Sequence, residues 1–251
     1  MFECDLKLVR KHNLAPRIIS LTYEAADNAI VAFQPGQFLS LQFPANAISE
    51  TPLKRSYSIV NISPHPQHNR QIEIAVTLID GGVASEYFKN TQAGDLIAAK
   101  GPMGNLVLPE KIDKRLILIG TGTGMAPYRS MLHQLKTMLT AGLKVEILQG
   151  ARTRDELIYQ QEFLSLATEY HAGYRACLSR QADAEITCHE YAGHVGKPLQ
   201  QLEPDPENDL VYLCGHPAMV DQQVSYLTEL GFDTRSVKRE KYFVSGKNKA
   251  K

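Results

Sequence analysis

Hydrophobic and polar residues alternate in two different rhythms along the chain, and the change falls near residue 110. Up to that point, short alternating or apolar segments are separated by proline and glycine, which predicts β-strands rather than long helices. The predicted strands are 6–10, 17–23, 38–43, 55–61, 72–78 and 96–100, with one short helix at 83–89. This pattern is typical of an antiparallel β-barrel.

After residue 109, apolar runs alternate with segments of helical periodicity. The runs are 116–119, 145–148 and 210–213, and the helical segments are 127–139, 156–167 and 217–230. Strands and helices in alternation favour an α/β fold with a parallel sheet. We therefore predict two domains, an antiparallel β-barrel over residues 1–109 and an α/β parallel-sheet domain over residues 110–251.

The most informative segment joins the first apolar run of the second domain to its helix, through Gly120-Thr-Gly-Thr-Gly-Met-Ala-Pro127. A strand, a tight turn and a helix in this order leave backbone N–H groups at the helix start pointing above the sheet. Gly120, Gly122 and Gly124 have no side chain to block a phosphate, which favours a nucleotide, although such turns also occur without a ligand. Met125 stands where the dinucleotide pattern G-x-G-x-x-G has its last glycine.

Composition and charge narrow the function classes. The 251 residues carry 27 basic and 27 acidic side chains, so no overall basic field favours nucleic acid. The start of the chain lacks the apolar core of a signal peptide, and no segment approaches membrane-spanning length, so we expect a cytoplasmic protein without a membrane span. The four cysteines are scattered without a C-x-x-C pair, which predicts free thiols and no metal site.

Within the barrel half, Arg55-Ser56-Tyr57-Ser58 combines a cation, a flat ring and a small hydroxyl in one predicted strand. Alternate residues of a strand share a face, so Arg55 and Tyr57 project to one side and Ser58 to the other or towards the strand end. This set suits a ligand with a phosphate and an extended aromatic system. The alternative is an exposed arginine beside a tyrosine that pairs across strands.

A second barrel segment, Gly82-Val83-Ala84-Ser85, begins the predicted short helix. The backbone N–H groups at that helix start and the Ser85 hydroxyl could bind an anion. The alternative is that the serine only caps the helix.

Together with two further motifs, Gly-Pro-Met-Gly and Cys-Gly-His-Pro-x-Met, these segments follow one another along the chain. The order is R-x-Y-S, G-x-x-S, Gly-Pro-Met-Gly, Gly-Thr-Gly-Thr-Gly-x-Ala-Pro and Cys-Gly-His-Pro-x-Met. In this order they resemble the ferredoxin–NADP⁺ reductase family, and the ending Arg-Glu-Lys-Tyr-Phe with a short tail is most similar to its bacterial ferredoxin/flavodoxin members. The resemblance implies that the barrel binds FAD. Arg55 is then expected at the pyrophosphate, Tyr57 against the flavin and Ser58 near its N5. The other expected FAD contacts are Ser56, Gly82, Val83, Ala84, Ser85, Tyr242 and Phe243.

For the second domain, the resemblance implies a site for NADPH/NADP⁺. The expected pyrophosphate contacts lie in the glycine-rich turn, at Gly122, Thr123, Gly124 and Pro127. After the next strand stand Arg152 and Arg154 with no acid before Asp155, which suggests a 2′-phosphate rather than free ribose hydroxyls, and Arg180 is a third candidate cation. Either arginine alone is more commonly a solvated loop cation. His194 stands where NADP-selective relatives often carry another arginine.

Four residues are expected to serve catalysis by this resemblance: Ser58, Cys214, Glu240 and Tyr242. Cys214 and Gly215 would face the nicotinamide, and Cys214 would position it, because no base beside it in sequence would activate the thiol. Glu240 would lie near the point of hydride transfer, or else be a surface acid. Tyr242 would stack on the flavin, and Phe243 and the tail would return to cover its adenine, although a disordered terminus is the ordinary expectation.

The predicted function is that of a flavoenzyme exchanging a hydride between NADPH and FAD, and single electrons with ferredoxin or flavodoxin. One alternative is an NAD(P)H-dependent flavin reductase component serving an oxygenase or a cytochrome. Another is a non-catalytic nucleotide-binding or sensor protein with the same fold. We expect a monomer with no nucleic-acid partner. A basic rim for an acidic carrier is predicted from Lys7, Arg10, Lys11, Lys238, Arg239 and Lys241.

Overall fold

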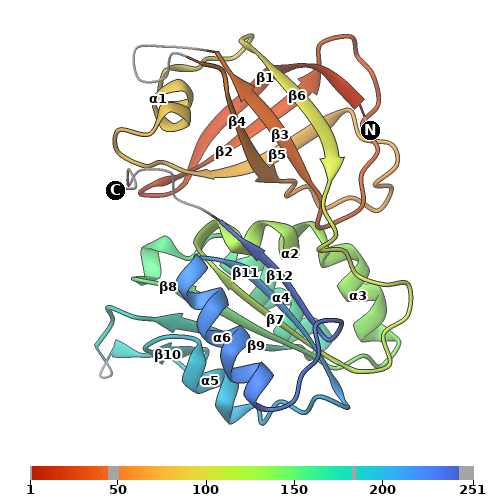
Figure 1. Cartoon of the computed structure of the whole chain (residues 1–251), viewed down its shortest axis with the longest axis vertical. Coiled ribbons are helices and arrows are strands. Elements are labelled where there is room, and N and C mark those ends of the chain that lie inside the picture. Colours follow the sequence, from red (N-terminus) through yellow and green to blue (C-terminus); the bar gives the residue numbers. More distant parts are fainter. Residues whose placement is uncertain (1, 45–50, 183–184, 243–251) are drawn as a thin grey trace. The chain divides into compact units, whose positions relative to one another are not determined.

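The computed structural model describes residues 2–44, 51–182 and 185–242. The chain divides into two compact units, one that ends at Val107 and one that begins at Leu108 (Figure 1). None of the helices within the described ranges is long and apolar enough to cross a membrane. Each unit is built around its own sheet.

The first unit contains an antiparallel sheet. In the order β4-β3-β6-β1-β2-β5, its strands are β4 (Leu53–Ser58), β3 (Phe38–Phe43), β6 (Leu96–Met103), β1 (Phe2–Ala15), β2 (Ile18–Ala25) and β5 (Gln71–Thr77). The chain just after β4 reaches β5, because Ile59 and Ile74 form an antiparallel bridge and Val60 N–H donates to the Glu73 carbonyl at 2.9 Å. The two ends of the sheet therefore meet, which confirms the predicted antiparallel barrel.

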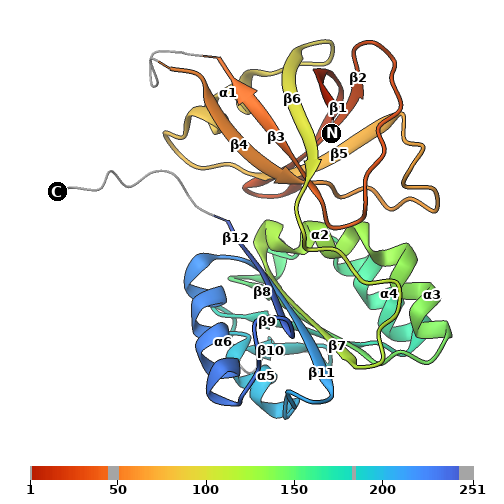
Figure 2. The ribbon, with the colours of Figure 1, turned by 45° about the vertical axis from the view of Figure 1, so that its right-hand side comes forward.

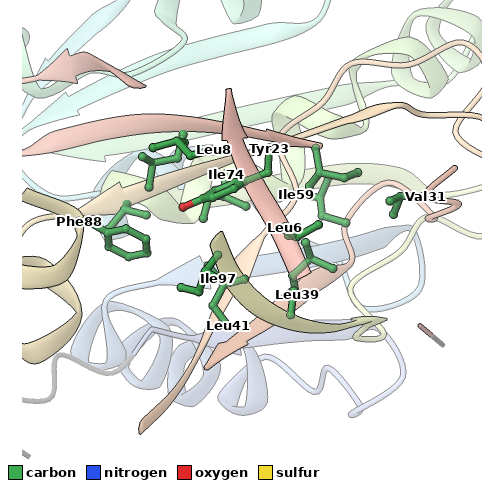
Figure 3. Packing of buried hydrophobic residues seen from close by; sticks show 14 of the residues in the cluster. Leu6, Leu8, Tyr23, Val31, Leu39, Leu41, Ile59, Ile74, Phe88 and Ile97 are labelled. Atoms are coloured by element: carbon green, nitrogen blue, oxygen red, sulfur yellow. The ribbon is translucent and has the colours of Figure 1, made fainter. Parts of the chain in front are cut away.

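The barrel interior is filled by alternate side chains of these strands (Figure 3). Helix α1 (Val83–Asn90) contributes Phe88, which is fully buried and meets Phe43 edge-on at a centroid distance of 5.2 Å. Burying a side chain of this size contributes roughly 1.5–3 kcal/mol. The same contact holds α1, and with it the Gly82 turn, against the barrel.

The second unit contains a parallel sheet. In the order β10-β9-β8-β7-β11-β12, its strands are β10 (Glu190–Ala192), β9 (Gly173–Leu178), β8 (Val145–Ala151), β7 (Arg115–Thr121), β11 (Asp209–Gly215) and β12 (Val237–Lys241). Leu116–Ile119 of β7 are fully buried, as expected of a strand covered on both faces. Figure 2 shows helices on both sides of the sheet: α3 (Leu132–Thr140) and α4 (Gln160–Tyr170) on one side, α5 (Gly196–Gln201) and α6 (Pro217–Glu229) on the other. The predicted α/β parallel-sheet fold is confirmed.

Several predicted boundaries are wrong for local reasons. The helix predicted over 127–139 is two helices, α2 (Ala126–Ser130) and α3, which meet at Met131. The helix predicted from residue 156 begins at Gln160, because Tyr159 has a left-handed backbone with φ 59° and the short 3₁₀ helix η2 (Arg154–Glu156) precedes it. The strand predicted over 55–61 leaves its ladder after Ser58, because Ile59 bridges to β5.

Candidate nucleotide-binding and active-site residues

The parallel sheet reverses its strand order at β7. Strands β8, β9 and β10 extend from one side of β7, and β11 and β12 lie on the other side. In open parallel sheets, ligands bind outside the carboxyl ends of the strands at such a reversal. Gly120 of β7 pairs with Cys214 of β11, so the glycine-rich turn and the Cys214-Gly215 segment leave the sheet side by side.

The three glycines of the turn have different structural roles. Gly122, in the 3₁₀ helix η1 (Gly122–Met125), has φ +54°, and a Cβ there would meet nothing within 4 Å. A Cβ on Gly124 would lie 2.3 Å from the Cys214 carbonyl oxygen, and one on Gly120 would lie 2.5 Å from the Met125 sulfur. The prediction that all three clear space for a phosphate therefore fits Gly122 alone, because the other two permit close packing of the turn against its own sheet.

The rest of the turn is consistent with an anion site. The Thr121 side chain, at the N-cap position of η1, makes no capping hydrogen bond to that helix. Thr123 is partly exposed, and Pro127 lies in the first turn of α2, where its missing N–H leaves no donor unsatisfied. A turn with open space at Gly122 and no cap from the Thr121 side chain can hold a phosphate.

Thr121 links the two segments, and sequence reasoning did not single it out. Its Oγ1 accepts a hydrogen bond from His216 N–H at 2.9 Å. Gly215 has φ +125°, and a Cβ there would lie 2.4 Å from the same oxygen. Gly215 therefore allows the β11 turn to approach Thr121. No local pattern indicates this contact, because the two residues are brought together only by the sheet.

Cys214 is fully buried at the end of β11. Burial raises the pKa of its thiol, and a side-chain hydrogen bond with Tyr242 offsets only part of that rise. The thiol is therefore neutral at physiological pH. This state is consistent with the expectation that Cys214 positions a ligand and does not attack it.

Glu240 lies opposite Cys214 in the β11–β12 ladder. The side chain is half-buried, and burial raises the pKa of its carboxyl from 4.5 to about 7. Partial burial distinguishes Glu240 from a fully exposed surface acid. A carboxyl poised near neutrality can hold or release a proton at working pH.

Tyr242 follows β12 and extends its ladder, because its N–H donates to the Gly215 carbonyl at 2.8 Å. The side chain is half-buried. Backbone pairing thus brings Tyr242, Cys214 and Glu240 to one edge of the sheet. Phe243 and the tail lie outside the described residues.

The three arginines expected at a 2′-phosphate lie at the carboxyl ends of β8 and β9. Arg180 N–H donates to the Arg152 carbonyl at 2.8 Å, so these two residues are neighbours. The Arg154 guanidinium instead donates to both oxygens of Glu190, at 2.6 and 2.7 Å, and to the Glu185 carbonyl at 2.9 Å. The Arg154 guanidinium is thus held by the protein itself, whereas Arg152 and Arg180 are neighbours through a backbone hydrogen bond.

Arg152 also has a carboxylate partner, Glu156. Its Nε donates to Glu156 Oε2 at 2.9 Å, and its Nη2 donates to Glu156 Oε1. The spacing of four residues could have indicated this pair in the sequence. The pairing of Arg154 with Glu190 could not be seen there, because 36 residues separate them.

In the barrel, the Arg55–Ser58 segment forms the end of β4. Arg55 and Tyr57 are half-buried and Ser56 is exposed, which is the alternation expected of a strand, and Ser58 is buried. The Tyr57 ring meets Phe88 edge-on at 5.4 Å, and burial raises the pKa of its hydroxyl. Tyr57 is therefore a neutral, firmly packed ring that is still partly accessible.

The start of α1 differs from its expected arrangement at Ser85. The Ser85 Oγ accepts a hydrogen bond from Ile79 N–H at 2.8 Å, and the hydroxyl is buried. Ser85 therefore holds the preceding turn and does not cap the helix. No described side chain caps α1 at Gly82, so the N–H groups of Val83 and Ala84 are left for another acceptor. An uncapped helix start of this kind fits a pyrophosphate.

Two of the basic residues predicted to form a docking rim are engaged within their own units. Lys11 Nζ donates to the carbonyls of Phe88, Lys89 and Thr91, at 2.7, 2.9 and 3.1 Å. It thereby caps the carboxyl end of α1. Lys241 pairs with Asp221 at 2.5 Å. In the described ranges, no group of three or more His, Cys, Asp or Glu side chains could hold a metal ion.

Family models match both halves of the chain. Residues 5–108 match the oxidoreductase FAD-binding domain, and residues 118–225 match the oxidoreductase NAD-binding domain. The half-exposed Tyr57 and the uncapped α1 suit the first cofactor, and the open turn at Gly122 suits the second. The predicted flavin and pyridine-nucleotide domains are therefore confirmed.

Individual relatives agree. Ferredoxin–NADP reductase B of Sorangium cellulosum is 31% identical over 248 residues, which cover 95% of this chain and 94% of that protein. The reductase component of propane 2-monooxygenase from Rhodococcus jostii is also 31% identical, but the chain spans only 60% of its length. A ferredoxin NADP⁺ reductase structure from Neisseria gonorrhoeae, with bound FAD and NADP, shares the fold with a TM-score of 0.78 at 24% identity, covering 96% of this chain and 99% of that one. The protein therefore belongs to the ferredoxin–NADP reductase family of FAD-dependent oxidoreductases.

Proposed function

We propose that this protein is an NADPH-dependent flavoenzyme that exchanges a hydride between NADPH and FAD, and single electrons with a ferredoxin or flavodoxin. The observation that carries the proposal is the reversal point of the parallel sheet. There the open turn at Gly122 lies beside Cys214, and Cys214 pairs with Glu240. A phosphate site next to a neutral thiol and a carboxyl poised near neutrality suits a nicotinamide nucleotide.

In the barrel unit, we assign FAD to the end of β4 and the start of α1. Arg55 pairs with the pyrophosphate, and the backbone N–H groups of Val83 and Ala84, which follow Gly82 at the helix start, donate to its oxygens. Tyr57 lies against the flavin ring, because its own ring is partly accessible and held by Phe88. The remaining contacts in this assignment are Ser56 and Ser58, and Ser85 supports the helix start through its hydrogen bond with the Ile79 N–H.

When bound, the flavin supplies the ability to take two electrons together and release them singly. Cys214 presents a neutral thiol that excludes water and orients the nicotinamide, and Glu240 holds a proton on its carboxyl oxygen up to about pH 7. Tyr242 controls how long the nicotinamide remains in place. Gly122, Thr123, Gly124, Pro127 and Gly215 shape the pyrophosphate site.

We assign the 2′-phosphate of NADPH to Arg152 and Arg180, which are neighbours at the carboxyl edge of β8 and β9. Arg154 supports that edge through Glu190 and is not a direct phosphate ligand in this proposal. The location we propose is the cytoplasm, because Cys4, Cys177, Cys188 and Cys214 are free thiols.

A second candidate function is that of a reductase component for an oxygenase. The propane 2-monooxygenase reductase is as similar in sequence as the ferredoxin–NADP reductase, although it is a longer protein. The two candidates differ in the electron acceptor and share the flavin chemistry.

The test is steady-state turnover of the purified holoprotein with NADPH against a panel of ferredoxins, flavodoxins and oxygenase components. A yellow protein that NADPH reduces, and that turns over fastest with a free ferredoxin or flavodoxin, supports the proposal. Faster transfer to an oxygenase component supports the second candidate. A colourless protein that FAD cannot reconstitute contradicts both and favours a non-catalytic nucleotide-binding protein.

A further inference from the structure

The Arg152 guanidinium, which the proposed function gives to a 2′-phosphate, already holds an anion from its own chain. Glu156 receives Arg152 Nε at 2.9 Å on one oxygen and Arg152 Nη2 on the other. It also accepts the backbone N–H of Arg152 at 3.3 Å. A carboxylate bound in this two-point way uses the donors that arginine offers to a phosphate.

The neighbouring pair of Arg154 and Glu190 shows what a permanent pair looks like in this part of the fold. The Glu190 side chain is only 2% exposed and also accepts the Thr187 N–H, and these contacts hold the pKa of its carboxyl at about 2. The two arginines are equally exposed, at 44% for Arg152 and 45% for Arg154, but the Glu156 side chain is 23% exposed and therefore more open to solvent than that of Glu190. Exposed ion pairs contribute little to stability, so Arg152 can exchange partners and Arg154 cannot.

Arg180 supplies a second positive charge for a phosphate that replaces Glu156 at Arg152. Its backbone N–H donates to the Arg152 carbonyl at 2.8 Å, and its side chain is exposed. No carboxylate within the described ranges forms an ion pair with Arg180. A phosphate with two negative charges could therefore contact Arg152 and Arg180 together, whereas the single carboxylate of Glu156 remains tied to the loop that carries Arg152.

We propose that Glu156 is a specificity-determining residue, an internal competitor that a 2′-phosphate must displace from Arg152. This inference rests on the proposed function, which assigns Arg152 to the nucleotide. A nucleotide without the 2′-phosphate leaves the Arg152–Glu156 pair intact, so the pair does not lower its binding affinity. Glu156 therefore lowers the affinity for NADPH but not for NADH. Its removal should increase the preference of the protein for NADPH.

The test is isothermal titration of the FAD-loaded protein with adenosine 2′,5′-bisphosphate and with 5′-AMP. In Glu156→Gln, the bisphosphate should bind about three- to tenfold more tightly than in the parent, because an exposed pair no longer has to be broken and one repelling charge is gone. Binding of 5′-AMP should stay within about twofold. Arg152→Ala should abolish the gain when combined with Glu156→Gln.

The matched control is Asp155→Asn, which removes the same charge from the adjacent residue. Asp155 is exposed and bonds to Thr153 rather than to Arg152. If Asp155→Asn tightens bisphosphate binding as much as Glu156→Gln does, a general charge effect replaces the competitor. Unchanged binding in Glu156→Gln shows that Glu156 does not compete for Arg152, and weaker binding shows that it aligns Arg152. Either result overturns the inference.

Two different measurements test the role of Glu156 and the proposed function. Reduction of the parent flavin by NADPH tests the proposed function, and bisphosphate affinity tests Glu156. A parent that NADPH reduces, with no gain in Glu156→Gln, keeps the function and overturns only the inference. A parent that NADPH does not reduce overturns the proposed function, and the affinity comparison still decides whether Glu156 competes for Arg152.

Discussion

Replacing Glu240 by glutamine tests whether this carboxyl is poised for proton exchange. Burial raises the pKa of the Glu240 carboxyl from 4.5 to about 7. Each pKa unit corresponds to about 1.36 kcal/mol, so ionising the folded protein at Glu240 costs about 3 kcal/mol more than ionising the unfolded chain. Glutamine has a similar shape and never bears that charge.

The sign of the effect follows from the direction of the shift. Below about pH 4.5 the carboxyl is protonated in both the folded and unfolded states, so parent and variant should be equally stable. Between about pH 4.5 and 7 the unfolded state loses its proton first, and the parent loses stability relative to Glu240→Gln. Above about pH 8 the variant should be more stable by up to about 3 kcal/mol.

An infrared difference titration of the parent against Glu240→Gln measures the carboxyl directly, and urea unfolding at pH 4.5, 6 and 8 measures the stability difference. The control is Glu229→Gln at the exposed end of α6, where we expect a change within about 0.5 kcal/mol at every pH. A carboxyl signal that disappears near pH 4.5 would show that Glu240 is hydrated and would remove the physical basis for its proposed role.

Three further predictions follow from other parts of the fold. Gly124→Ala should lower stability by about 1–3 kcal/mol or more, because its Cβ would lie 2.3 Å from the Cys214 carbonyl oxygen. A melting temperature no lower than that of Gly196→Ala, where a Cβ would meet Gln223 only at 3.5 Å, would contradict this. Tyr242→Ser should raise kcat/KM for NADH relative to NADPH about two- to tenfold, because a stacked ring contributes about 0.5–1.5 kcal/mol to the free energy of stacking. An unchanged ratio shows that Tyr242 does not cover the flavin. Lys11→Met should cost about 1–2 kcal/mol in urea unfolding through the lost cap of α1, and a neutral result would mean that water replaces the lysine.

The sequence predicts the central elements of both sheets because their signals are local. Leu116–Ile119 form an unbroken apolar run before glycines, and the barrel strands alternate between Pro and Gly turns. Strand β12 (Val237–Lys241) was missed, since four of its five residues are charged and it forms through its pairing with β11, which lies far from it in the sequence before folding. Strands β9 and β10 and helix α5 were also not predicted.

The sequence indicated many of the candidate site residues, but it did not indicate which residues they contact. The order of motifs indicated Arg55, Cys214 and Glu240, but not that Ser85 holds Ile79 or that Glu190 holds Arg154. Such contacts join segments that only the folded chain brings together. The roles of the site residues remain predictions, and the contacts of the arginines already revise which of them can reach a phosphate.

Among the strands that the structure describes, β12 is the edge of its sheet and pairs with β11 alone. An edge strand opens locally at lower free energy than the central strands, because fewer hydrogen bonds and contacts have to break. One such opening would separate Glu240 and Tyr242 from Cys214 at the same moment while the core of the unit stays folded. As urea is increased, turnover should therefore fall at a lower concentration than the circular dichroism signal. The stability of the sheet edge, rather than that of the core, then sets the range of conditions in which the enzyme works.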